Sequence, residues 1–178
     1  MTLGPLHLSR NDPRSWRTAG AGLVLAAAIV GLAIVVGGST ARVLNPIGAV
    51  LWLASGVFLA VSLPSAQRGM PGWLAAIASG FVLGALVRPS GVVEVVVWFV
   101  LAGAVVVFAA ADRTGAWALL VPAIYLPVHL LIGIGRAILR NGGVRTDPPP
   151  TAAIVPLGML LAAAGAGALA AAIVRRGR

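Results

Sequence analysis

Residues 91–111 read GVVEVVVWFVLAGAVVVFAAA and contain one charged side chain, that of Glu94. A segment of about 20 apolar residues is long enough to cross the ~30 Å hydrocarbon core of a bilayer as an α-helix. A lone strand is excluded there, because its backbone N–H and C=O groups would stay unpaired in lipid. This stretch therefore predicts a transmembrane helix, and the rest of the chain repeats its pattern.

Further apolar runs lie on both sides of this segment. They are Thr18–Gly38, Pro46–Leu63, Gly72–Val87, Gly115–Gly135 and Thr151–Val174. The run from Gly72 is the shortest of them. The alternating apolar and polar pattern of an outer-membrane strand is absent from the sequence. The predicted fold class is all-α, a polytopic membrane helical bundle of about six transmembrane helices.

The composition agrees with a lipid environment. Of 178 residues, 60% are apolar and 10% are charged, whereas soluble domains average about 25% charged residues. A soluble fold of this size has too much surface for its volume to hide so much apolar area. The chain has no cysteine, which excludes disulfides, thiolate catalysis and cysteine-ligated metals.

The formal net charge is +9, and every basic residue is an arginine. The arginines lie at the ends of apolar runs and not along one polar face, which is typical of membrane interfaces rather than of nucleic-acid binding. The expected partners are the lipid bilayer and either other membrane subunits or a second copy of the chain, as a homo-oligomer. We expect no nucleic acid and no cofactor.

Short connections rich in turn residues separate the runs. They are Asn45-Pro46, Pro64-Ser65, Gly69–Gly72, Arg88–Gly91 and Asp112–Gly115. Such links favour antiparallel packing of neighbouring helices. We therefore expect three consecutive helical hairpins, with one long loop, residues 136–150, inside the third.

The distribution of arginine also predicts the orientation. With the N-terminus inside, the inner segments hold eight arginines and the outer loops hold five. We expect a cytoplasmic N-terminal tail (1–17), a six-helix membrane domain (18–174) and a cytoplasmic arginine-rich C-terminus (175–178) in a bacterial inner membrane. The first run exceeds the ~7–15 apolar residues of a signal-peptide core, so we interpret it as a membrane helix.

An internal repeat runs along the chain. A tryptophan opens each odd-numbered helix and an arginine closes each even-numbered one: Trp16, Trp73 and Trp117, then Arg68, Arg113 and Arg175. One explanation is the triplication of a hairpin. The other is that interfacial tryptophan and arginine are common at the ends of any membrane helix.

The second unit of this repeat, WLAAIASGFVLGALVRPSGVVEVVVWFVLAGAVVVFAAADR (residues 73–113), resembles the HdeD-like family of small bacterial inner-membrane proteins, which are linked to acid resistance. The first unit is a looser match. The third departs from the family with Pro122, Pro127, His129 and its long loop. The resemblance implies six helices, an inner-membrane location and a stress-related role, and it carries no catalytic residues over.

Small residues recur at four-residue spacing in two of the predicted helices. They are Ala76, Gly80 and Gly84 in the third, and Gly158, Ala162, Ala166 and Ala170 in the sixth. Such stripes let helix backbones approach closely. They predict packing either within the bundle or at the face of a homodimer.

Two ionisable side chains lie inside the apolar runs and form a candidate ligand or proton site, Glu94 near the start of the fourth helix and His129 in the fifth. Tyr125 shares a helix face with His129, while Arg88 and Arg136 lie just outside the same boundary. A carboxylate and an imidazole in contact would respond to pH. The alternative is that Glu94 reaches to the headgroups and that His129 hydrogen-bonds a neighbouring helix.

Pro122 and Pro127 are expected to break the fifth helix, because proline lacks the backbone donor of a helical turn. A broken membrane helix either lines a cavity or carries a static kink. An enzyme is not expected, because two alternative serines, Ser55 and Ser79, for one histidine form no motif, and metal sites need more ligands. The predicted function is a non-enzymatic structural or accessory subunit, with a small channel or transporter, acting between the fourth and fifth helices, as the alternative.

Overall fold

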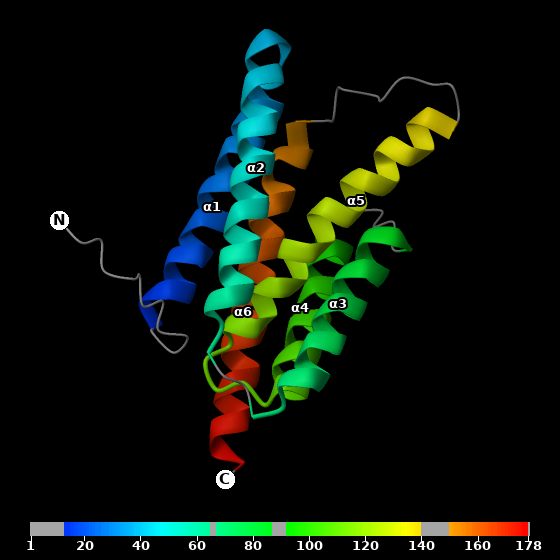
Figure 1. Cartoon of the computed structure of the whole chain (residues 1–178). Coiled ribbons are helices and arrows are strands. Elements are labelled where there is room, and N and C mark those ends of the chain that lie inside the picture. Colours follow the sequence, from blue (N-terminus) through cyan, green and yellow to red (C-terminus); the bar gives the residue numbers. More distant parts are fainter. Residues whose placement is uncertain (1–12, 65–66, 87–91, 140–149, 178) are drawn as a thin grey trace, which may run out of the picture.

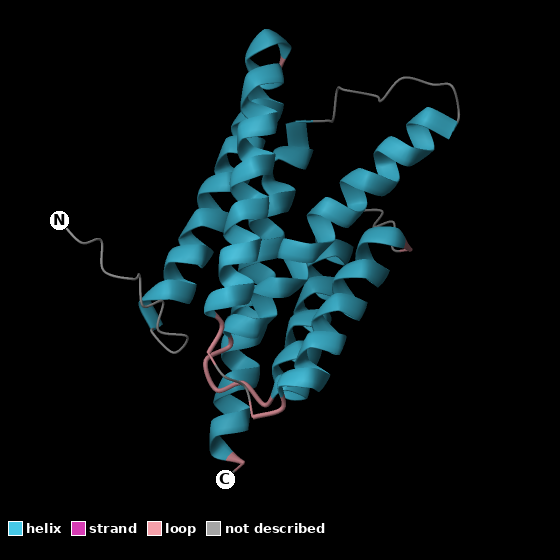
Figure 2. Ribbon diagram, viewed as in Figure 1, coloured by secondary structure: helices cyan, strands magenta, loops and turns pink. Residues whose placement is uncertain are grey.

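The computed structural model describes residues 13–64, 67–86, 92–139 and 150–177. Its α-helices are α1 (Pro13–Val36), α2 (Gly38–Ser62), α3 (Gly69–Ala85), α4 (Val92–Ala110), α5 (Leu120–Leu139) and α6 (Val155–Arg176). Two short 3-10 segments, η1 (Ala116–Leu119) and η2 (Pro150–Ile154), lead into α5 and α6. All regular elements in these ranges are helical (Figure 2). The predicted all-α class and the predicted number of helices are confirmed.

The first connection differs from its prediction. The chain turns at Gly37 and Gly38, whose φ angles are +65° and +59°, a region that glycine enters without steric cost. Because the turn is complete there, α2 begins at Gly38 and contains Asn45 and Pro46, which the sequence had placed in the break. Pro46 removes a single backbone donor, and the helix continues through it. At the N-terminus, α1 starts at Pro13, within the predicted tail.

Consecutive helices run in opposite directions, and we name the end of the bundle where α1 begins and α6 ends the terminal end (Figure 1). The predicted pairs α1–α2 and α3–α4 pack together. In the third pair, α6 packs on η1 and to a lesser extent on α5, while α5 packs mainly on α3 and α6 mainly on α4. The third predicted hairpin therefore packs together mainly at its start, through η1. The long connection between α5 and α6 allows the two helices to separate.

The dimensions and surface of the helices are those of a membrane protein. α1, α2, α4, α6 and the segment from η1 into α5 are each long and apolar enough to cross a bilayer. α3 is apolar but has only 17 residues. Large apolar side chains cover the outside of the bundle, for example Val35 at 66% exposure and Leu131 at 69%. The chain is a multi-pass integral membrane protein whose outer surface contacts lipid.

The predicted stripe on α3 packs inside the bundle. Ala76, Gly80 and Gly84 are all buried. A Cβ atom added at Gly80 would lie 2.7 Å from the Ile124 side chain, and one added at Gly84 would lie 2.8 Å from Val128. Glycine at these positions therefore lets α3 lie directly against α5, as small residues do in other membrane bundles.

The close approach of α6 lies elsewhere on the helix than the predicted stripe. Gly158 and Ala162 are half-buried, and a Cβ at Gly158 would meet no heavy atom within 4 Å. Ala166 and Ala170 are buried. The tightest contact is at Gly167, where a Cβ would lie 2.6 Å from the carbonyl oxygen of Gly115. Four-residue spacing alone did not distinguish this face from the neighbouring one.

Candidate functional site

The predicted polar cluster is organised around Tyr125. This side chain is buried on α5 and its ring stacks on that of His129, with centroids 5.3 Å apart and planes at 19°. Phe99 on α4 meets Tyr125 edge to face at 5.0 Å. Three aromatic rings thus join α4 to α5, while the His129 ring itself is exposed. The contacts described for His129 are stacking contacts.

The described charged members of the cluster, Glu94 and Arg136, lie on different helices. Glu94 is half-buried in the first turn of α4, and its meeting with His129 stays a prediction. Arg88 lies outside the described residues. The Nη2 atom of Arg136 donates a long hydrogen bond, 3.5 Å, to the Ala85 carbonyl at the end of α3. A cation is favoured at such a helix C-terminus, where the last carbonyls are unpaired.

Pro127 lies inside α5 and leaves the carbonyl of residue 123, four positions earlier, without its helical donor. The indole Nε1 of Trp52 on α2 donates to this Ala123 oxygen at 3.4 Å. Trp52 is 1% exposed, so the bond satisfies two polar groups that lipid could not. Pro122 lies in the first turn of α5, where helical N–H groups have no partner, and it breaks nothing.

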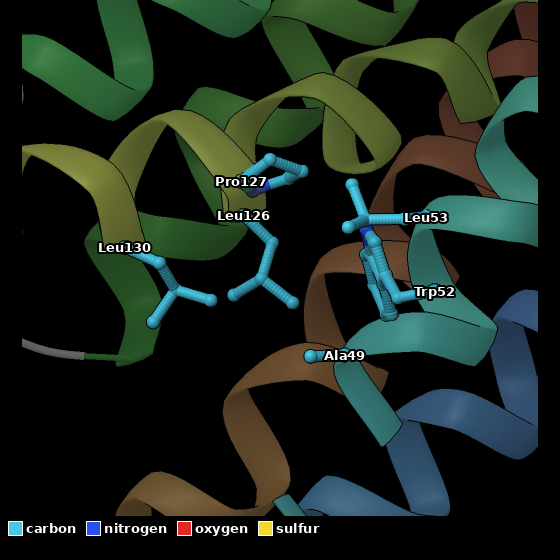
Figure 3. Close-up of a pocket in the computed structure, with 6 residues that line it drawn as sticks. All are labelled: Ala49, Trp52, Leu53, Leu126, Pro127 and Leu130. Carbon is cyan, nitrogen blue, oxygen red and sulfur yellow. The ribbon is translucent and has the colours of Figure 1, made fainter. Parts of the chain in front are cut away.

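A small cavity lies beside this hydrogen bond, between α2 and α5. It has a volume of about 40 Å³ and is lined by apolar side chains (Figure 3): Ala49, Trp52, Leu53, Leu126, Pro127 and Leu130. The close-up shows Leu126 and Pro127 of α5 facing Trp52 and Leu53 of α2. The lining of this cavity is wholly apolar, so the space beside Pro127 cannot coordinate an ion or a polar substrate.

The most connected polar group of the described residues is Asp112, at the terminal end, which sequence reasoning treated only as part of a turn. Asp112 is 3% exposed. Its Oδ1 accepts from the Thr114 N–H and from Thr114 Oγ1, both at 2.9 Å, and its Oδ2 accepts from the Trp117 N–H at 3.2 Å. The carboxylate thus caps η1. The spacing of Asp and Thr before a helix is the signal that could have identified it.

Two of the repeated tryptophans lie beside this turn. Trp73 and Trp117 meet edge to face at 5.2 Å, and Trp117 Nε1 donates to the carbonyl of Pro64 at 3.2 Å. Trp16 is partly buried against the same core cluster. The repeated tryptophans therefore pack the ends of helices together, which both explanations of the repeat allow.

No group of three or more His, Asp or Glu residues that could hold a metal ion occurs within the part of the chain that the structure describes. No protein-family model matches the chain, and no significant match was found among curated proteins or solved structures. The resemblance of residues 73–113 to the HdeD-like family accordingly stays a prediction.

Proposed function

We propose that this protein is a non-enzymatic structural or accessory subunit of a bacterial inner membrane, with both termini in the cytoplasm. One observation supports this function. Among the described residues, four side chains donate hydrogen bonds across the fold to main-chain carbonyls: Trp52 to Ala123, Trp117 to Pro64, Arg136 to Ala85, and Arg175 to Arg113. Polar side chains used in this way hold helices in place.

The apolar outer surface is the part of the molecule that would meet other subunits. Along the second half of α5, Leu130, Leu131 and Ile134 are exposed, and a Cβ at Gly133 would meet nothing within 4 Å. Helix association in lipid depends on close packing and small residues. A subunit that docks its own helix on this face would also cover the cavity beside Pro127. The stress-related part of the proposal rests on the family resemblance alone.

The test is isolation of the tagged full chain from its native membrane in a mild detergent, followed by native gel electrophoresis and mass determination. We expect a complex larger than one chain with its bound detergent. A Leu131→Asn, Ile134→Asn variant should dissociate it, whereas Val35→Asn on α1 should not. A species of one chain in every preparation would contradict the proposal.

The alternative, a small channel or transporter between α4 and α5, is favoured by the three aromatic rings in contact that end on the exposed His129. Purified protein in liposomes with an entrapped pH-sensitive dye tests it. Under this alternative, proton flux exceeds that of protein-free liposomes and is lost in His129→Ala. Under the structural proposal, wild type and variant give the background rate.

A further inference from the structure

The three arginines that close the repeat units converge at the terminal end. The main-chain N–H of Arg68 donates to the carbonyl of Ala110 at 3.3 Å, three residues before Arg113. The Nη1 atom of Arg175 donates to the carbonyl of Arg113 at 2.6 Å. The α2–α3 connection, the α4–α5 connection and the end of α6 are therefore held together (Figure 2). All three arginines are exposed.

A backbone contact fixes this arrangement. Gly115 has a φ of +81°, and a Cβ there would lie 2.6 Å from the carbonyl carbon of Gly167 on α6. The α4–α5 connection is thus pressed against α6 two turns before Arg175. Because the approach is between main chains, the position of Arg113 over the end of α6 does not depend on flexible side chains.

The positive charge of this cluster is not balanced by the acids that the structure describes. Those acids are Asp112 and Glu94. Asp112 is buried and its oxygens accept hydrogen bonds from the turn that follows it. Glu94 lies in the first turn of α4, at the other end of that 19-residue helix, about 24 Å away at a rise of ~1.5 Å per residue. Like charges gathered at one end of the bundle repel one another, so the arrangement favours an anion from outside the described chain.

We propose that Arg68, Arg113 and Arg175, which we name the arginine triad, bind the phosphate of an anionic phospholipid headgroup. The triad lies just beyond α2 and α4 and in the last turn of α6, at the depth where headgroups begin. Guanidinium groups match phosphate with paired N–H donors, and Arg175 uses only one of its nitrogens on Arg113. Clusters of basic residues at helix ends are suited to anionic lipids. This site is independent of the proposed subunit role.

The purified full chain in neutral detergent tests the proposal by titration with phosphatidylglycerol, measured as retained lipid by native mass spectrometry and as a rise in Tm. Phosphatidylcholine is the uncharged reference. A direct hydrogen bond from a guanidinium group to the phosphate contributes about fivefold in affinity. We therefore expect Arg68→Gln, Arg113→Gln to weaken phosphatidylglycerol binding by roughly 25-fold. Both residues enter the described hydrogen bonds through main-chain atoms alone, so the tie to Arg175 survives.

The matched control is Arg17→Gln, Arg176→Gln, which removes the same charge from the same end outside the triad. We expect it to keep wild-type affinity within about twofold, because these arginines do not contact the phosphate, against the roughly fivefold that each triad arginine contributes. Equal losses in the two double variants would overturn the site in favour of diffuse attraction. Inorganic phosphate at equal concentration should not raise the Tm; if it displaces the lipid, the site is one for a soluble anion and the proposal fails. The Tm of each variant without lipid verifies folding.

Discussion

The terminal end and the opposite end of the bundle are held together by different means. At the terminal end, Gly115 and Gly167 bring main chains into contact, and Asp112 caps the turn between α4 and α5. At the opposite end, α5 diverges from α6 (Figure 1), and Leu139 is 85% exposed. Main chains approach there where Gly31 of α1 meets Ala153 of η2, whereas the second half of α5 is held by stacked rings and by the Arg136 hydrogen bond to Ala85.

Because of this difference, we expect the terminal end to be the more stable part of the chain and the second half of α5 to be the more mobile part. Segments with few buried contacts open at low free energy, whereas tightly connected ones open only with the whole fold. We expect the terminal end to carry most of the sensitivity to substitution. The second half of α5 should tolerate change, because its exposed residues meet lipid and little protein.

The largest effect is expected for Gly167→Val. The new side chain would overlap the main chain of Gly115, which cannot move aside, and overpacking of this kind costs about 3 kcal/mol or more. Thermal unfolding in detergent measures the loss. Gly158→Val on the same helix is the control, since a Cβ there meets nothing within 4 Å. Equal melting temperatures for the two variants would remove the distinction between the two faces of α6.

Next in size is Asp112→Ala. It leaves the Thr114 and Trp117 N–H groups without their acceptor, and loss of a cap together with a buried hydrogen bond costs about 2 kcal/mol. Intrinsic tryptophan fluorescence, to which Trp117 contributes, reports the transition during chemical unfolding. Asp112→Asn keeps one acceptor oxygen and should lose roughly half as much. If Ala and Asn variants match wild type, the turn is held by Gly115 alone.

At Pro127 in α5 we expect a smaller loss of stability, and its size should depend on whether the proline is present. Trp52→Phe removes the donor to Ala123 and should cost about 1 kcal/mol. Pro127→Ala restores the helical donor to the same carbonyl, so Trp52→Phe should cost much less in that background. A double-mutant cycle on unfolding free energies measures this coupling. Additive effects would mean that the indole bond does not replace the missing helical one.

The smallest effect concerns the opposite end. His129→Ala loses its stacking on Tyr125, worth about 0.5 kcal/mol or slightly more. Its coupling with Tyr125→Leu should exceed its coupling with Glu94→Gln, which we expect within the ~0.5 kcal/mol of independent sites. The same unfolding assay gives both cycles. A larger Glu94 coupling would show that the carboxylate and the imidazole meet in solution.

Sequence reasoning predicted the features that follow from hydrophobicity and from local chemistry. The apolar runs located the helices, because in lipid every backbone group has to be paired within a helix. The α3 stripe was predicted from spacing, since Gly80 and Gly84 fall on one face. The loss of a donor at Pro127 was also predicted, although its replacement, Trp52, lies 75 positions earlier in the chain and no local rule connects them.

The packing of α5 on α3 and of α6 on α4, and the hydrogen-bonded turn at Asp112, were not predicted, for physical reasons. Short links favour neighbours, but the long connection before α6 places no such limit, and packing at Gly103 and Gly167 brings α6 to α4 and η1. Glu94 and His129 were predicted as a site because they are ionisable side chains inside apolar runs. Asp112 lies at the end of such a run, where an acid is common, and its burial depends on the packing of the turn that follows it, which no local pattern in the sequence reveals.

The shortness of α3 has a consequence for the surrounding bilayer. At ~1.5 Å per residue, its 17 residues span about 26 Å, whereas the 24 residues of α1 span about 36 Å. The hydrophobic thickness of the protein therefore changes around its circumference. Lipid beside α3 must thin or α3 must remain upright, while α1 fits the same bilayer by tilting. We expect the leaflets to be thinner beside α3 than beside α1.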